Sequence, residues 1–226
     1  MFVRPAWIAL ALALVFGASS VTAAEAIVGG VSIKLPPPAG FCELTDRNPS
    51  DKRMLTVISE LVTKVGNKLL VMSADCKQLT EWRASKRPLL DDFAQYQTPI
   101  SDSPPTETVA QTCATLRAQG SELAAKQAPD IKANVERALK NVKINETRFI
   151  GVLAESAVAC YAGLLQKLRT EVSTDKVQLT VFAATIAKNR SHFIYRMAAY
   201  INSDSVDTTL KGLRGTVAAF LAANRN

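Results

Sequence analysis

Catalytic motifs are scarce in this chain. Among its 226 residues there is one histidine, His192, so a Ser-His-Asp or Cys-His site would have to use that side chain. No G-x-S-x-G serine occurs after residue 24, and no G-x-G-x-x-G or Walker loop is present. These absences disfavour a serine hydrolase and a nucleotide-dependent enzyme. Because His192 lies beside a predicted turn, we interpret it as a structural or surface histidine rather than a catalytic base.

Metal and redox motifs are also missing. No C-x-x-C pair occurs, which disfavours a thioredoxin-like redox site and a zinc ribbon. Two acid pairs, Asp91-Asp92 and Asp204 with Asp207, are alternatives for a divalent ion or a glycosidase. The first pair adjoins a predicted strand and the second a predicted helix N-terminus, where acids favour the helix dipole. We therefore predict no catalytic residue, no metal site and no cofactor.

The apolar run near the N-terminus is too short to span a membrane. It covers residues 8–16, whereas a transmembrane helix needs about 20 apolar residues. Arg4 precedes the run and small residues follow it at positions 17–26, which is the three-part layout of a secretory signal peptide. No cysteine lies near the junction, so a lipid anchor is disfavoured. Residues 1–24 are predicted to be a signal peptide, with an uncleaved anchor as the minority interpretation.

Cleavage of this leader is predicted near a run of alanines. Ala23 and Ala24 are the favoured sites, and Ala26 is the alternative because Ala24-Glu25-Ala26 forms an A-x-A sequence. The short leader favours a bacterial periplasm or medium over a eukaryotic secretory route. The remaining chain, residues 25–226, is predicted to be periplasmic or secreted, without stable membrane insertion.

Aromatic residues are few and positive charge is in excess. Phe, Trp and Tyr make up 6% of the chain, and its formal net charge is +7. A positive excess suits an acidic partner, anionic lipid or nucleic acid. The basic residues are scattered, however, and neither interleaved aromatics nor a groove-reading helix is visible. We interpret the charge as a solvated surface and predict no nucleic-acid partner.

All four cysteines, Cys42, Cys76, Cys113 and Cys160, follow the predicted leader. In an oxidising compartment an even count predicts up to two disulfides, with three possible connectivities. Cys42 follows a predicted strand and Cys76 ends the next, and the helix between them returns the chain so that these ends lie side by side. We therefore pair Cys42 with Cys76. Cys113 on a helix then pairs with Cys160 on a strand, or both remain buried thiols.

The start of the mature chain predicts an edge segment followed by a helix. Residues 31–44 alternate apolar side chains and contain Pro36-Pro37-Pro38, which is typical of an extended edge segment that cannot pair fully. Asn48-Pro49 begins a helix, because asparagine caps and proline fits the first turn. Gly66-Asn67 ends that helix.

Two short strands are predicted next, at residues 68–76 and 92–100, with a helical turn at 76–83 between them. Trp82, in that turn, is the single tryptophan beyond the leader. We interpret it as a lid over the core, and a stacking platform for a sugar or ring is the alternative.

The central region has helical periodicity. Residues 106–142 are predicted to form two helices, because Gly120 and Pro129 separate their apolar stripes. We treat residues 106–143 as a helical insert that covers one face of a sheet, and a partner-binding arm is the alternative.

The last third predicts strands followed by a helix. Residues 148–153 are a strand candidate, and residues 157–168 are a strand or, because their centre is rich in alanine, a helix. Strands 177–187 and 192–201 form a hairpin whose turn is 188–191. A final helix from Ser205 to Asn224 packs across that hairpin. The predicted class is α+β, a single domain with an antiparallel sheet flanked by helices.

A Pro-rich lead-in to Gly40-Phe41, the segment Phe149-Ile150-Gly151-Val152-Leu153, the hairpin at 181–200 and a last helix ending at Asn224 occur in this order. This order resembles the PsbP-like superfamily, which includes a photosystem accessory subunit, a nuclear Ran-binding protein and many secreted bacterial proteins of unknown role. The resemblance implies an antiparallel sheet with helices on both faces and an accessory or binding role. It implies no active site.

Three functions are compatible with these features. The leading hypothesis is a periplasmic accessory or protein-interaction protein without catalytic activity, which docks a partner through a sheet face or the helical insert. The alternative is a carrier of a small ligand or lipid, with a cavity between sheet and helices. A hydrolase that uses His192 is third.

Overall fold

The protein is built around a seven-stranded antiparallel sheet with helices on both faces. The computed structural model describes residues 23–101, 103–138, 142–170 and 173–225, so nearly all of the predicted signal peptide lies outside the described residues. In chain order the elements are β1 (Ala24–Val28), β2 (Val31–Leu35), β3 (Phe41–Glu43), α1 (Pro49–Lys64), β4 (Asn67–Asp75), α2 (Cys76–Arg83), β5 (Phe93–Pro99), α3 (Val109–Ala138), β6 (Val142–Glu155), β7 (Ala159–Thr170), β8 (Ser173–Ala187), β9 (Arg190–Ala199) and α4 (Asp204–Ala223). The predicted α+β class is confirmed, and the architecture is consistent with a single domain.

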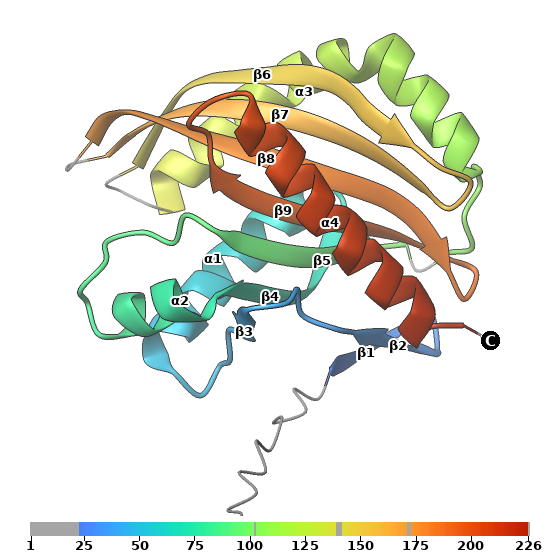
Figure 1. Ribbon diagram of the computed structural model, residues 1–226, viewed down its shortest axis with the longest axis horizontal. Helices are drawn as coiled ribbons and strands as arrows, with labels where there is room; N and C mark the ends of the chain where they lie inside the picture. Colours follow the sequence, from blue (N-terminus) through green and yellow to red (C-terminus); the bar gives the residue numbers. More distant parts are fainter. Residues whose placement is uncertain (1–22, 102, 139–141, 171–172, 226) are drawn as a thin grey trace, which may run out of the picture.

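The strands of the large sheet lie in the order β3-β4-β5-β9-β8-β7-β6. Figure 1 shows α4 crossing in front of β8 and β9, with α1 and α3 behind the sheet. The main core lies under α4, where Leu213, Val217 and Phe220 meet Val181 and Ile194 of the hairpin. The predicted packing of the last helix across the hairpin is therefore confirmed. The turn of this hairpin is shorter than the predicted 188–191, because β9 begins at Arg190. The two turn residues, Lys188 and Asn189, have positive φ, 46° and 56°, as a two-residue hairpin turn requires.

The N-terminal segment differs from its prediction as a single edge segment. β1 and β2 pair with each other in a separate two-stranded sheet, and β3 joins the large sheet beside β4. Gly29 and Gly30 make the turn between β1 and β2 with φ of 54° and 77°, a region that glycine enters without strain. This hairpin was missed because residues 25–30, between the predicted leader and the predicted edge segment, were assigned to no strand.

Helix α3 is a second correction. The predicted two helices are one helix of 30 residues that contains Gly120 and Pro129. Gly120 is a packing residue, since a Cβ atom there would stand 2.4 Å from the Phe149 ring of β6. Pro129 is exposed, so the helix accommodates it on its solvent side. The insert is also shorter than expected, because Val142 is buried and begins β6.

Candidate functional site

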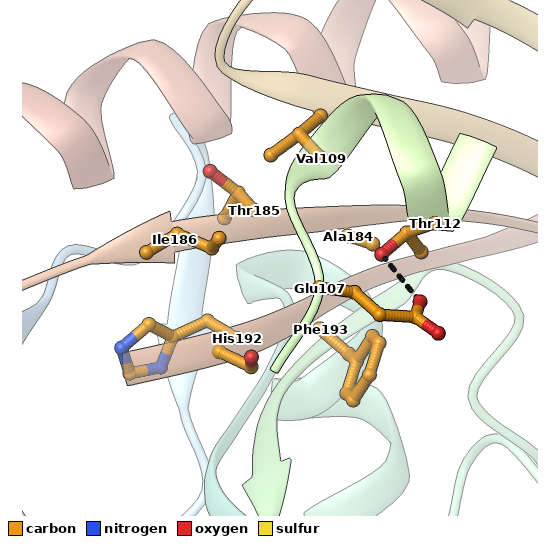
Figure 2. A pocket seen from close by; sticks show the side chains of 9 residues that line it. Glu107, Val109, Thr112, Ala184, Thr185, Ile186, His192 and Phe193 are labelled. Atoms are coloured by element: carbon orange, nitrogen blue, oxygen red, sulfur yellow. Dashed lines mark hydrogen bonds between the residues drawn. The ribbon is translucent and has the colours of Figure 1, made fainter. Parts of the chain in front are cut away.

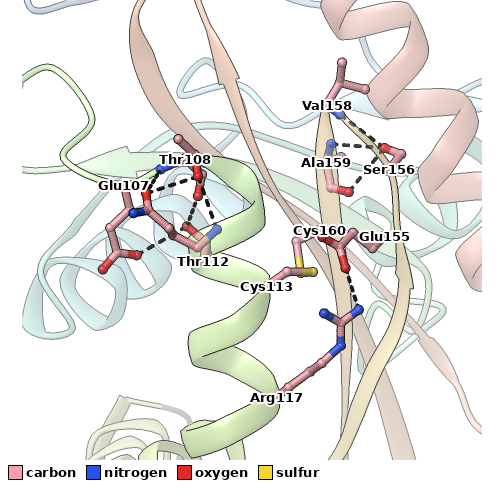
Figure 3. Close-up of a disulfide and its surroundings, with 11 residues drawn as sticks. Glu107, Thr108, Thr112, Cys113, Arg117, Glu155, Ser156, Val158, Ala159 and Cys160 are labelled. Carbon is pink, nitrogen blue, oxygen red and sulfur yellow. Dashed lines mark hydrogen bonds and ion pairs between the residues drawn. A yellow bond between two sulfur atoms is a disulfide. The ribbon is translucent and has the colours of Figure 1, made fainter.

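The two disulfides are Cys42–Cys76 and Cys113–Cys160, the pairs that the sequence favours. Their Cα atoms are 4.9 Å and 5.4 Å apart, within the usual range. Figure 3 shows the second bridge, which joins α3 to β7 beside an ion pair between Arg117 and Glu155. The long helix is thus covalently fixed to the sheet. Two disulfides fit an extracellular or periplasmic location.

His192 is placed in the core rather than at a surface or a reaction centre. Its side chain is 1% exposed, and its ring stands edge-on to Phe220 with centroids 5.0 Å apart. Neither ring nitrogen has a hydrogen-bond partner within the described structure. Burial lowers the pKa of His192 to about 4. The residue on which the hydrolase hypothesis depends is therefore a buried, neutral imidazole at pH 7.

A cavity of about 30 Å³ lies between the start of α3 and the β8–β9 turn, next to His192. Figure 2 shows Glu107 and Thr112 on one side of it, with the imidazole of His192 pointing away from them. A space of this size accommodates about one or two water molecules. It is too small for the lipid that the carrier hypothesis requires.

The two acid pairs have structural roles. Asp91 forms ion pairs with Arg87 and Lys176, and Asp92 pairs with Arg196 at 3.2 Å. Burial raises the pKa of Asp92, while Arg196 acts in the opposite direction. Asp204 and Asp207 lie in the first turn of α4, where the helix dipole favours them.

Within the described residues, no group of three or more His, Cys, Asp or Glu side chains is arranged to hold a metal ion. None of the described helices is long and apolar enough to cross a membrane.

An open groove lies between α1, the end of α2 and the loop before β5, and we name it the α1–α2 groove. It has a volume of about 700 Å³. Its apolar lining residues are Pro49, Met54, Val57, Trp82, Pro88 and Leu89. Its polar lining residues are Ser50, Lys52, Arg53 and Thr56. The groove therefore combines an apolar lining with one sign of charge.

The first turn of α1 forms one wall of this groove. Asn48 caps the helix by accepting hydrogen bonds from the backbone N–H groups of Ser50 and Asp51, as the sequence predicts. Asp51 is fully buried. Its carboxylate accepts hydrogen bonds from the Arg83 guanidinium and from the Thr45 backbone N–H at 3.0 Å. Because Arg83 ends α2, this ion pair fixes α2 against α1.

Trp82, next to Arg83, forms the opposite wall. It packs against the second core cluster, which consists of Leu44, Met72, Ala74, Leu79 and Leu90. The interpretation of Trp82 as a lid over the core is confirmed. The structure adds that the half-buried ring also lines the groove, which the sequence did not reveal.

Both ends of α2 are held by further contacts. The Cys42–Cys76 bridge ties its first residue to β3, and Asp75 caps it by accepting from the Gln78 backbone N–H at 2.9 Å. At the other end Ser85 has φ of 57°, and its N–H donates to the Trp82 carbonyl at 2.9 Å, as in a helix-terminating motif.

The loop that carries Pro88 and Leu89 is braced by Arg87. This guanidinium pairs with Glu81 on α2 and with Asp91 after the loop, both at 3.1 Å. The groove wall is therefore attached to α2 on one side and to the start of β5 on the other.

Among the groove residues, the sequence indicated a binding role only for Trp82, as the alternative to a lid over the core. The available signal was the pair Lys52-Arg53 directly after a helix cap, on the exposed side of an amphipathic helix. Trp82 lies 29 positions after Arg53, and no local pattern links the two. The groove forms only when α2 docks beside α1.

Comparison with known proteins adds little. No protein-family model matches the chain, and no curated protein matches it. Among solved structures it is similar to the Ran-binding protein Mog1p of Saccharomyces cerevisiae, with 6% sequence identity and a TM-score of 0.31, over 89% of this chain and 93% of that chain. This likeness is too weak to carry an argument about function.

Proposed function

We propose that this chain is an exported accessory protein that binds another protein through the α1–α2 groove. The observation that carries the proposal is the groove itself, in which a half-buried tryptophan and two exposed cations line one open surface. Tryptophan and arginine are the side chains most enriched at the energetic centres of protein interfaces. The proposed surface is thus neither the sheet face nor the α3 insert.

The rigidity of the groove supports this role. The Asp51–Arg83 ion pair, the Cys42–Cys76 bridge and the Arg87 contacts hold its walls before any partner arrives. A surface that is already ordered loses less conformational entropy on association than a flexible one. Binding through this groove therefore requires little rearrangement of the protein.

Export belongs to the same proposal, with cleavage after Ala23. β1 begins at Ala24, and Ala24, Glu25 and Ala26 pair with Leu35, Lys34 and Ile33 of β2. Cleavage after Ala26 would remove these residues of the hairpin, whereas cleavage after Ala23 leaves it complete. Membership of the PsbP-like superfamily is also proposed, since an antiparallel sheet with helices on both faces is the architecture that the resemblance implies.

Site-specific photocrosslinking in the producing cell tests the proposed surface. A photoreactive phenylalanine analogue replaces Val57 or Leu89, which are half-buried lining residues of the groove. Leu123 on α3, which is exposed, serves as the control position. We expect one discrete protein adduct from both groove positions, and its loss when Trp82→Ala is added. Adducts from Leu123 alone, or groove adducts that survive Trp82→Ala unchanged, would contradict the proposal.

A further inference from the structure

We propose that the occupant of the α1–α2 groove is an acidic peptide segment of the partner that places one apolar side chain against Trp82. This inference rests on the proposed function and adds the chemistry of the partner. It follows from the charges that the groove leaves unpaired, from its apolar lining and from its open shape.

The charged lining residues of the groove are Lys52 and Arg53. Both are exposed, and neither forms an ion pair with a carboxylate of the described residues. Arg53 instead donates a hydrogen bond to the Ser50 hydroxyl at 3.1 Å. Two positive charges therefore remain available at the rim.

Two other cations beside the groove, Arg83 and Arg87, are already paired, unlike Lys52 and Arg53. Arg83 is bound to Asp51, and Arg87 is bound to Glu81 and Asp91. Asp51 itself is buried and bonded, so it does not neutralise Lys52 beside it. Complementary charge must come from the partner.

The N-terminus of α1 does not supply an additional anion site. The Asn48 side chain already accepts from the Ser50 and Asp51 backbone N–H groups. The attraction for an acidic segment therefore rests on the two side-chain charges and is sensitive to salt.

The apolar part of the lining favours an apolar side chain of the partner peptide. Met54, Val57 and Leu89 face the same cavity as Trp82. Methionine adapts its shape to different apolar groups, and the tryptophan ring is supported from below by the second core cluster. Filling this surface with a leucine-like or aromatic side chain removes apolar area from water on both partners.

A peptide fits these features better than a nucleic acid does. Single-stranded nucleic acid is usually held by several aromatic platforms along a positive track, whereas Trp82 is the one aromatic lining residue of this groove. An extended peptide matches an open groove with a single anchor point and a charged rim.

Trp82 supplies a reporter for the test. The chain has two tryptophans, and the other, Trp7, lies in the predicted leader. The protein is purified after export, with Trp7 removed by processing or replaced by phenylalanine. Four short peptides are titrated against Trp82 fluorescence: one with acidic residues around a central leucine, one with alanine for that leucine, one with lysines for the acids and one with amides for the acids.

We expect the acidic leucine peptide to bind more tightly than the other three, and to weaken as salt rises from about 20 mM to about 200 mM. The variant Lys52→Gln/Arg53→Gln is expected to lower its affinity about fivefold. Lys126→Gln/Lys211→Gln, which removes the same charge from exposed sites on α3 and α4, is the matched control and is expected to leave affinity unchanged. Thermal unfolding of each variant verifies that the fold is intact.

The outcomes separate this inference from the proposed function. If groove crosslinks occur but the four peptides bind equally, or the two double variants weaken binding equally, the acidic occupant is wrong while the interaction surface stands. If neither crosslinks nor peptide binding is observed, both fall. If laurate binds at one equivalent and the peptides do not, the groove is a small-ligand site, which also overturns both.

Discussion

At the residue scale, the ionisation of His192 is coupled to folding. Its pKa is lowered by burial to about 4, from an ordinary value of 6.5. Between these two values the unfolded chain binds a proton that the folded protein does not. The stability that the neutral imidazole maintains is therefore complete above pH 6.5 and is lost as pH falls through 4.

We predict that replacing this histidine removes a pH dependence. From pH 7 to pH 4 the free energy of unfolding of the natural protein should fall by about 3 kcal/mol through His192. His192→Leu places an apolar side chain in an apolar site, so the free energy of unfolding of this variant should lack this contribution to the fall. Urea unfolding at several pH values measures the difference, and identical pH profiles would refute it.

Asn224 is the second residue whose role is specific. Its side chain accepts from the Lys34 backbone N–H at 2.9 Å and donates to the Lys34 and Phe220 carbonyls at 2.8 Å and 2.9 Å. The residue is 4% exposed. The Asn224 side chain therefore links the end of α4 to β2 by pairing with both backbone polar groups of Lys34.

Asn224→Ala is predicted to reduce the free energy of unfolding by about 1–3 kcal/mol, because it leaves buried backbone groups unpaired. Asn224→Asp should also destabilise, since an ionised carboxylate accepts but cannot donate to the two carbonyls. Urea unfolding is the measurement, with the exposed neighbour Arg225→Ala as the control. Equal stability of Asn224→Ala and the control would show that these bonds contribute nothing.

At the element scale, the position of α3 depends on how closely it approaches β6. A Cβ atom at Gly120 would stand 2.4 Å and 2.6 Å from two atoms of the Phe149 ring. In an exposed helix Gly→Ala stabilises by about 1 kcal/mol. Overpacking a close contact costs about 1–3 kcal/mol, so the two effects compete and the clash is the larger.

We therefore predict that Gly120→Ala destabilises the protein and that adding Phe149→Leu reverses the sign of its effect. Thermal unfolding of the two single variants and the double variant forms the required cycle. A stabilising Gly120→Ala in the natural background would mean that α3 shifts away from β6 without cost. The Cys113–Cys160 bridge opposes such a shift, since it lies seven residues away on the same helix.

At the scale of the whole molecule, the N-terminal β1–β2 hairpin is held against the C-terminal part of the chain by hydrogen bonds. Beyond the Asn224 contacts, Lys188 donates to the Ser32 carbonyl at 3.0 Å, Arg190 to the Gly29 carbonyl at 2.9 Å and Tyr96 to the Pro36 carbonyl at 2.6 Å. Val28, Ile33 and Leu35 are buried in the main core. The residues directly after the predicted cleavage site are thus integral to the folded protein.

The mass of the exported protein is predicted to correspond to a chain that starts at Ala24. Denatured mass spectrometry measures the N-terminus, and a gain of about 2 Da per bridge on reduction counts the disulfides. We expect two bridges. A chain that starts at Ile27 would lack most of β1 and contradict the proposed cleavage, and an unprocessed chain would contradict the signal peptide.

The amino-acid sequence by itself determined the features that depend on neighbouring residues. The Asn48 cap of α1, the hairpin that contains β8 and β9 and the last helix α4 are local, because side chains a few positions apart share a face or a turn. The α+β class and the favoured cysteine pairs followed from the order of such elements. The sequence predicted a break in α3 that the structure does not have. Glycine and proline weaken a helix locally, whereas the contact with Phe149 and the disulfide to Cys160 hold this helix against the sheet from distant positions in the chain.

Only the tertiary structure decided the candidate site. Lys52 and Arg53 meet Trp82 across the groove because Asp51, buried at one helix start, binds Arg83 at another helix end. The attachment of the β1–β2 hairpin to the end of α4 likewise depends on Asn224, which is 190 positions from Lys34. These contacts are selected by burial and hydrogen bonding between segments that the chain brings together only on folding, and no local pattern encodes them.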